Sequence, residues 1–242
     1  MFAINRILPK AGLIGSLVFL IFILSCTTVI DEAPSRVSPP ADPELLDIRR
    51  DIHRQPELAG QEERTSRLVA DYLLQQGLDV RTGIGGYGVV GVLEGGLPGP
   101  VVAYRADMDA MPTELPDPVS FRSEIPGVRH FCSHDVHTTI ALGVARDLAA
   151  QRETLPGTVK FIFQPAEEEG TGARGMIENG VLENPAPASI FGLHLSNFEV
   201  GQIAYREGPL MPAVDVLQVS LYGTGQLLSA ARYYRRAIAK VR

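Results

Sequence analysis

The sequence is short of the residue types that hold small secreted scaffolds together or that attract nucleic acid. It has only two cysteines in 242 residues, too few for a disulfide framework. Its basic residues form no internal run and its net charge is −6, which argues against nucleic acid as a partner. Tryptophan is absent, and this absence excludes nothing. The hydrophobic share of 45% is typical of a globular protein, so class and function have to come from patterns along the chain.

The apolar run near the N-terminus is too short for a comfortable membrane span of about 20 residues. This run, Ala11–Leu24, follows two basic residues and leads into Ser25-Cys26, as an export signal does. The segment resembles the lipobox of bacterial lipoproteins, in which a signal peptidase cuts before a Cys that then carries lipid. We therefore expect residues 1–25 to be a signal peptide and Cys26 to be lipidated, in an exported protein anchored on the periplasmic or cell-surface side. An uncleaved anchor, or a plain secretory signal with an incidental Cys, is the alternative.

Beyond the signal, the patterns predict a linker and then an α/β domain. Proline-rich residues 26–42 cannot sustain a helix or a central strand, so we expect an extended tether. Helical spacing and short apolar runs then alternate along the chain, which favours an α/β fold. The expected helices are 45–54, 61–76, 139–151 and 173–178. The expected strands are 78–81, 89–93, 101–104, 159–163 and 190–193, with 203–205 and 214–221 as further candidates.

The densest chemical signal lies between Arg129 and Thr138, where one thiol, three imidazoles and a carboxylate occur together. Cys132 and His134 are two residues apart, so an extended or loop backbone would place their side chains on the same side. Thiolate and imidazole suit a zinc-like cation, and a metal would hold a Cys that is otherwise prone to oxidation in an exported protein. An inert buried Cys among satisfied core histidines is the alternative, which the density of the cluster disfavours.

Carboxylates follow two of the predicted strands. Three consecutive glutamates begin at Glu167, and Asp107 and Asp109 follow the strand 101–104. Because α/β folds build their sites at the carboxyl ends of strands, one Glu can bind a metal while its neighbour takes a proton from water. An Asp there can hold a metal-binding imidazole in one tautomer. A solvated acidic turn and a loop cap are the alternatives, and His194 is either a site residue or a satisfied core histidine.

These motifs occur in the same order in a known family. The chain resembles the amidohydrolase branch of the M20 metallopeptidases, which includes aminoacylases, hippurate hydrolases and auxin-conjugate hydrolases. The similar segments are Arg50–Glu57, Arg105–Ala110, His130–Thr138, Gly157–Glu168, Gly172-Ala173 and Gly192–His194. Several motifs in order are a stronger signal than any one of them. The resemblance implies a mixed-sheet catalytic domain like that of metal-dependent exopeptidases over residues 43–212.

The resemblance also implies roles for the site residues. It implies hydrolysis of an N-acyl amino acid or similar amide conjugate by a metal-activated water, with Glu167 as general base. Two divalent ions would be bound, of a kind such as Zn, Mn, Co or Ni. The implied metal ligands are Cys132, His134, Glu168 and His194. The implied supporting residues are Asp107, Asp135 and His137.

The chain departs from the family pattern within the ligand cluster and at its C-terminal end. Ser133 and Val136 stand where the family usually has Gly, which would strain the backbone only at a positive φ. Phe131 stands where the family has Ala. The match then reaches the first strand of an inserted lid domain, residues 213–225, while the basic residues 226–242 resemble nothing in the family. In the family, the lid supplies a His that stabilises the oxyanion, and the chain that returns from it supplies a last metal-binding His.

Three functions follow as hypotheses. The chain is an active metal-dependent amidohydrolase, an inactive truncated remnant of one, or a membrane-tethered binding module without catalysis. Because one ligand of the family is missing, we expect at most one tightly held metal. We interpret residues 226–242 as off-frame sequence, with a basic amphipathic helix on a membrane surface as the alternative.

Overall fold

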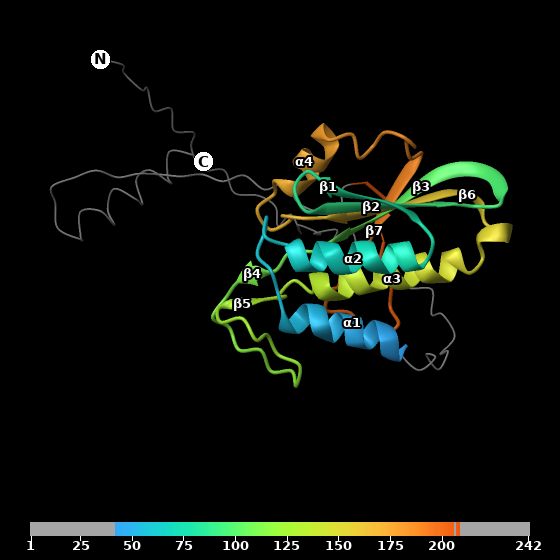
Figure 1. Cartoon of the computed structure of the whole chain (residues 1–242). Coiled ribbons are helices and arrows are strands. Elements are labelled where there is room, and N and C mark those ends of the chain that lie inside the picture. The colour runs from blue at the N-terminus through green and yellow to red at the C-terminus, as the bar shows by residue number, and fades with distance from the viewer. Residues whose placement is uncertain (1–41, 206, 209–242) are drawn as a thin grey trace, which may run out of the picture. The chain divides into compact units, whose positions relative to one another are not determined.

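A computed structural model describes residues 42–205 and 207–208 (Figure 1). The predicted signal peptide, Cys26, the linker up to residue 41, the strand candidate 214–221 and the tail 226–242 therefore lie outside the described residues. The contacts divide the chain into two units, and every described helix and strand falls in the unit Ala33–Phe198. None of the helices in the described ranges is long and apolar enough to cross a membrane.

The strand expected at 203–205 is wrong. The backbone there is described, and it has no strand assignment. An apolar alternation becomes a strand only where a neighbouring strand takes its hydrogen bonds, and these residues have no strand partner within the described part of the chain.

A mixed sheet of five strands, in the order β1-β2-β6-β3-β7, forms the centre of the described unit. β1 pairs antiparallel with β2, and β2 pairs antiparallel with β6. β6, β3 and β7 then run parallel to one another. This arrangement confirms the expected α/β class with a mixed sheet. The strands span Asp79–Ile84 (β1), Gly88–Glu94 (β2), Leu97–Asp107 (β3), Pro156–Gln164 (β6) and Ser189–Gly192 (β7).

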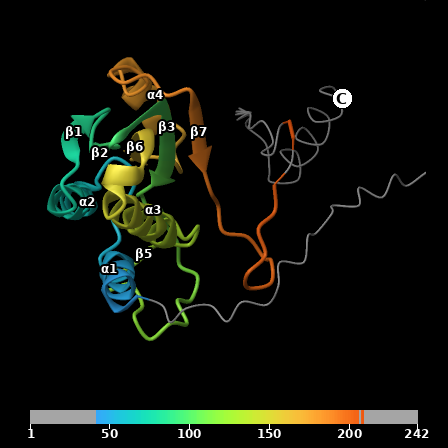
Figure 2. The same ribbon diagram turned by 90° about the vertical axis from the view of Figure 1, so that its right-hand side faces the viewer.

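Helices cover both faces of this sheet (Figures 1 and 2). α2 (Glu63–Gln75) and α3 (His134–Ala149) pack on one face, and α1 (Pro43–Arg54) packs against α3. α4 (Gly172–Glu178) lies over the opposite face. The sequence did not predict two short strands, β4 (Met111–Pro112) and β5 (Val128–Arg129), or the 3-10 turn Arg152–Thr154, because such short pieces have no measurable periodicity.

The main hydrophobic core lies between the sheet and the helices α2 and α3. Val69, Leu73, Leu142 and Phe161 are fully buried there. Burial of each such side chain contributes about 1.5–3 kcal/mol relative to exposure. Gly91 of β2 lets α2 approach closely, because a Cβ at this position would lie only 2.9 Å from Cδ1 of Leu73. This packing fixes α3 against the sheet and so fixes the position of the residues at its N-terminus.

α3 begins at His134, well before the predicted start at residue 139. Its first turn is polar but buried, so apolar periodicity did not reveal it. Cys132 lies in the turn before the helix, and Ser133 occupies the N-cap position at a φ of 65°. Cys132 and His134 therefore converge through a turn into a helix, and not along an extended backbone.

Candidate metal centre

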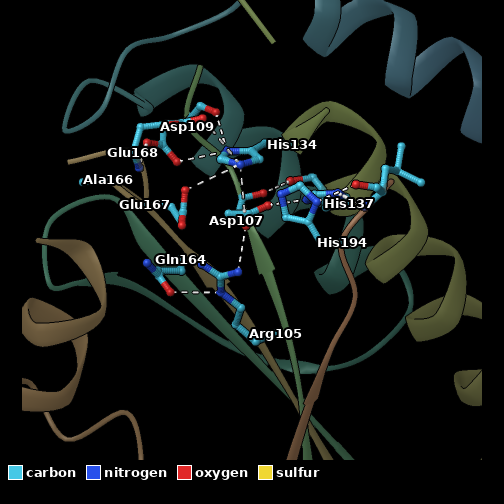
Figure 3. A network of polar contacts seen from close by, with 12 residues as sticks. Arg105, Asp107, Asp109, His134, His137, Gln164, Ala166, Glu167, Glu168 and His194 are labelled. Carbon is cyan, nitrogen blue, oxygen red and sulfur yellow. Dashed lines mark hydrogen bonds and ion pairs between the residues drawn. The ribbon is translucent and has the colours of Figure 1, made fainter. Parts of the chain in front are cut away.

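The parallel strands β3, β6 and β7 end at the same edge of the sheet. β3 ends at Asp107, which lies opposite Gln164 at the end of β6. The chain leaves these strands toward Asp109, toward Glu167 and Glu168, and toward His194. The N-terminus of α3 brings His134 to the same edge (Figure 3). The carboxyl end of the parallel strands is where the sequence placed the site.

Cys132, His134 and Glu168 direct three different donor atoms at one point. The thiol sulfur, an imidazole nitrogen and a carboxylate oxygen all lie within 4.8 Å of one another. His134 Nε2 is 3.8 Å from Oε1 of Glu168 and 3.7 Å from Oε2 of Glu167. Atoms that bind one zinc ion at about 2.0–2.3 Å in tetrahedral geometry stand roughly 3.5 Å apart. The three side chains, called the donor group below, therefore have nearly the spacing that a bound cation requires.

The imidazole of His134 supplies the test of fit for a metal. Nε2 is buried and has no hydrogen-bond partner among the described residues. A buried polar atom left unpaired is costly, and its lone pair is free for a cation. Sulfur, nitrogen and oxygen donors together match the preferences of zinc and similar divalent ions. The residues present therefore fit the cation that the sequence implied.

Asp109 fixes the orientation of His134. The Nδ1 atom of His134 donates to the backbone carbonyl of Asp109 at 2.8 Å, and Oδ1 of Asp109 lies 3.3 Å away. A hydrogen bond from Nδ1 fixes the tautomer of the His134 ring and leaves Nε2 directed toward the other two members of the donor group. Burial would lower the pKa of His134, but Asp109, Asp107 and Glu168 together raise it. Asp109 also accepts the backbone N–H of Glu168 at 2.9 Å, so one aspartate positions two members of the donor group.

Asp107 supports a different histidine. Its Oδ1 accepts from Nδ1 of His137 at 2.7 Å, and its Oδ2 accepts from Nη1 of Arg105 at 2.7 Å. Burial would raise the pKa of Asp107, but the hydrogen bond from His137 and the charges of His134 and Arg105 lower it to about 2. Asp107 is therefore a carboxylate at neutral pH, with both oxygens bound.

His137 uses both ring nitrogens. While Nδ1 donates to Asp107, Nε2 accepts the backbone N–H of Leu195 at 3.0 Å. Asp107, His134 and His137 have a spacing that could also hold a cation, but these hydrogen bonds engage the two nitrogens of His137. His137 thus holds the segment that carries His194, and its supporting role at a metal centre stays a prediction.

His194 lies at the edge of the site, against His137. The centroids of the two rings are 4.7 Å apart in an edge-on arrangement (Figure 3). Nδ1 of His194 donates to the carbonyl of Leu195 at 2.6 Å, and the side chain is exposed. The donor group does not include His194. Its role as a metal ligand stays a prediction.

Glu167 and Cys132 lie in contrasting electrostatic settings. The side chain of Glu167 is 41% exposed, so its carboxylate meets both solvent and the donor group. The Cys132 thiol is half-buried, and its pKa is raised to about 12 by burial, then by a hydrogen bond with Glu168 and by the negative charges of Glu168, Glu167 and Asp107. A cation at the donor group would offset these charges and favour the thiolate.

Asp135 faces away from the donor group. Its Oδ2 accepts from Nδ1 of His53 at 3.0 Å and from Nε of Arg49 at 3.2 Å, both on α1. The other ring nitrogen of His53, Nε2, lies 3.1 Å from Oδ2 of Asp117. Asp135 thus supports the packing of α1 against α3, and within the described structure its side chain makes no hydrogen bond or ion pair with a predicted ligand. The contact between His53 and Asp117 could not be predicted from the sequence, because a carboxylate in a loop follows no periodic pattern that indicates its partner.

The fold and the donor group together define the class of protein: an α/β domain with a candidate metal centre at the carboxyl edge of its sheet. The model of Peptidase family M20/M25/M40 matches residues 103–239, more than half of the 242 residues. The chain belongs to this family.

Individual relatives agree with this assignment. Thermostable carboxypeptidase 2 of Saccharolobus solfataricus is 42% identical over 185 residues, which cover 75% of this chain and 47% of that protein. An IAA-amino acid hydrolase of Arabidopsis thaliana is 44% identical over 182 residues, 75% of this chain and 41% of that protein. The chain thus spans less than half the length of these curated relatives.

A solved structure supports the fold. The Bacillus subtilis YXEP protein, described as a dinuclear metal binding peptidase from the M20 family, is 40% identical, with a TM-score of 0.60. The superposition covers 63% of this chain and 42% of that one. It confirms the mixed-sheet catalytic-domain fold that the sequence resemblance implied.

Proposed function

We propose that this chain forms the metal-binding part of an amidohydrolase that cleaves the amide bond of N-acyl amino acids or similar conjugates. The observation that carries the proposal is the buried, unpaired Nε2 of His134, which faces the donor atoms of Cys132 and Glu168 and has Glu167 beside it. The names of the relatives support the substrate class. A carboxypeptidase and an IAA-amino acid hydrolase both cleave an amide bond whose amine belongs to an amino acid.

The residues of the site divide the work of hydrolysis between them. A divalent cation held by Cys132, His134 and Glu168 would act as a Lewis acid and lower the pKa of the attacking water. Glu167 accepts a proton from that water and passes it to the leaving amine, and its exposed carboxylate 3.7 Å from Nε2 of His134 suits both transfers. Asp109 keeps the imidazole of His134 in place throughout, since it binds the other ring nitrogen.

We also propose that the chain holds no more than one divalent ion tightly. The donor group supplies three protein ligands around one point. His194 is the remaining predicted ligand, and it lies outside that group against His137. A second ion would therefore have few protein ligands among the described residues.

An assay with matched glutamate variants tests the proposed reaction. The purified chain is incubated with N-acyl amino acids and Zn²⁺, Mn²⁺ or Co²⁺, and the released amino acid is measured. We expect metal-dependent turnover that Glu167→Gln reduces by about 10²–10⁴-fold, because the general base is lost. Glu169→Gln is the control, since this exposed neighbour lies outside the donor group. Absence of turnover would contradict the proposal and favour the inactive remnant, and equal turnover in both variants would contradict the role of Glu167 as general base.

A further inference from the structure

α2 begins at a carboxylate that does not cap it. Glu62 occupies the N-cap position, yet its side chain makes no cap hydrogen bond to the helix in the described structure. Glu57 caps the helix instead: its Oε1 accepts from the N–H of Arg64 and its Oε2 from the N–H of Thr65, both at 2.8 Å. The side chain of Glu62 is therefore free to make other contacts, although N-cap carboxylates ordinarily serve the helix that follows.

Glu62 reaches the loop that carries the candidate base and ligand. Its side chain is fully buried, and its Oε1 accepts from the backbone N–H of Ala166 at 2.7 Å and of Gly60 at 2.9 Å. Its Oε2 is buried without a hydrogen-bond partner among the described residues. Burial raises the pKa of Glu62, which reflects how unfavourable this place is for a carboxylate. A polar group kept in such a place needs a compensating contact, and Ala166 provides it.

Ala166 adopts a conformation that needs support. Its φ is 48°, in the left-handed region, which costs a residue with a Cβ about 1–2 kcal/mol. Its carbonyl accepts from the N–H groups of Thr171 and Gly172 at 3.3 and 3.1 Å, and Glu62 holds its N–H. The loop closes so tightly that a Cβ on Gly172 would lie 1.6 Å from the carbonyl oxygen of Pro165. The backbone of Ala166 is thus held by hydrogen bonds at both its N–H and its carbonyl.

A second carboxylate holds the same loop two residues later. Asp109 accepts the N–H of Glu168 at 2.9 Å, while Glu62 accepts that of Ala166 (Figure 3 shows Asp109, Ala166 and Glu168). Glu167 lies between these two anchored peptides. We propose that Glu62 is a positioning residue, which holds the turn at Ala166 and thereby aims Glu167 and Glu168 at the donor group. The part concerning Glu167 as a base rests on the proposed function, whereas the hold on the loop does not.

Two variants and a matched control test the hold on the loop. Glu62→Ala removes the acceptor, Glu62→Gln keeps an oxygen in its place, and Glu57→Ala removes a comparable carboxylate that binds only the start of α2. Amide hydrogen exchange of the purified chain, without added metal, should speed up at residues 166–172 in Glu62→Ala. Glu62→Gln should restore most of the protection, and Glu57→Ala should speed up exchange at residues 64–65 instead. Unchanged exchange at residues 166–172 in Glu62→Ala would overturn the proposal.

Cobalt titration tests the consequence for the site. We expect Glu62→Ala to weaken Co²⁺ binding by about 10- to 100-fold, as the loss of groups that orient metal ligands does. Glu62→Gln should bind close to the wild-type level, and Glu57→Ala should bind like the wild type even where it lowers thermal stability. Equal affinity in Glu62→Ala and wild type would overturn the positioning role.

If the wild-type chain binds Co²⁺ but hydrolyses no N-acyl amino acid, the proposed function fails while the role of Glu62 in holding the loop stands. If it binds no Co²⁺, the metal centre fails and hydrogen exchange alone decides on Glu62.

Discussion

His53 is a buried side chain that connects three parts of the chain through its hydrogen bonds. Its two ring nitrogens lie 3.0 Å from Asp135 and 3.1 Å from Asp117, so it links α1 to α3 and to the loop that contains Asp117. Burial would lower the pKa of His53, but the two carboxylates raise it above 6.5. The pKa values of Asp117 and Asp135 are lowered below 3.8: burial would raise them, but hydrogen bonds, which include one from His53 to each, outweigh it. At a pH above the pKa values of Asp117 and Asp135 and below that of His53, all three side chains are therefore charged.

The network predicts a pH-dependent contribution to stability. Because the folded-state pKa of His53 is raised, its contribution is fully present below the unfolded value of 6.5 and is lost as pH rises through the folded value. The difference in free energy of unfolding between wild type and His53→Gln should therefore be largest in mildly acidic solution and shrink as pH rises. In stronger acid it should shrink again, as Asp117 and Asp135 become protonated. Urea denaturation over a pH series measures this difference, and a difference that grows with rising pH would contradict the assignment.

At the scale of elements, the start of α3 carries a local strain that the sequence only hinted at. Ser133 has a φ of 65° and makes no side-chain cap to α3 in the described structure, so it takes the penalty of the left-handed region without the usual gain of an N-cap serine. By the sequence resemblance, this position and that of Val136 are ones where Gly is usual. Val136 lies inside α3 and is not among the residues with positive φ. Of the two departures, only Ser133 strains the backbone.

The two positions therefore predict opposite effects of the same replacement. Ser133→Gly should raise the free energy of unfolding by about 0.5–1 kcal/mol, because the gain from relieving a φ that costs about 1–2 kcal/mol exceeds the added flexibility of the unfolded chain. Val136→Gly should lower it by about 0.5–1 kcal/mol, since Gly is unfavourable within a helix. Urea denaturation of both variants checks this. A loss of stability in Ser133→Gly equal to that in Val136→Gly would show that the turn is not strained.

The elements that the sequence predicted well are those whose burial leaves a period. The strands that end near Asp107 and Gln164 and the helix from residue 61 came from apolar spacing, and the ends of parallel strands then located the site. The long-range polar contacts gave no such signal. Glu62 meets Ala166 across 104 positions of sequence, and nothing in its sequence context distinguishes it from an ordinary acidic residue at the start of a helix, although its side chain is fully buried. For the same reason the sequence could not distinguish Asp107, the last residue of β3, from Asp109 just beyond it, and it is Asp109 that binds Nδ1 of His134.

At the scale of the whole molecule, the described unit brings three candidate ligands for one metal ion to the carboxyl edge of its sheet. The start of α3 and the turn before it supply His134 and Cys132, the loop after β6 supplies Glu168, and Asp109, just after β3, orients both His134 and Glu168. The chain spans less than half the length of these curated relatives, so its substrate and its activity are proposals. The metal centre is the claim on which those proposals depend.

A cobalt titration of the purified chain followed by absorption tests that claim most directly. A bound thiolate gives Co²⁺ a charge-transfer band in the near ultraviolet, and the chain has only two cysteines, Cys26 and Cys132. We predict a band that saturates at about one equivalent of metal, that is lost in Cys132→Ser, and that remains in Cys26→Ser. A band that survives Cys132→Ser, saturation at two equivalents, or no band in the wild-type chain would contradict the account.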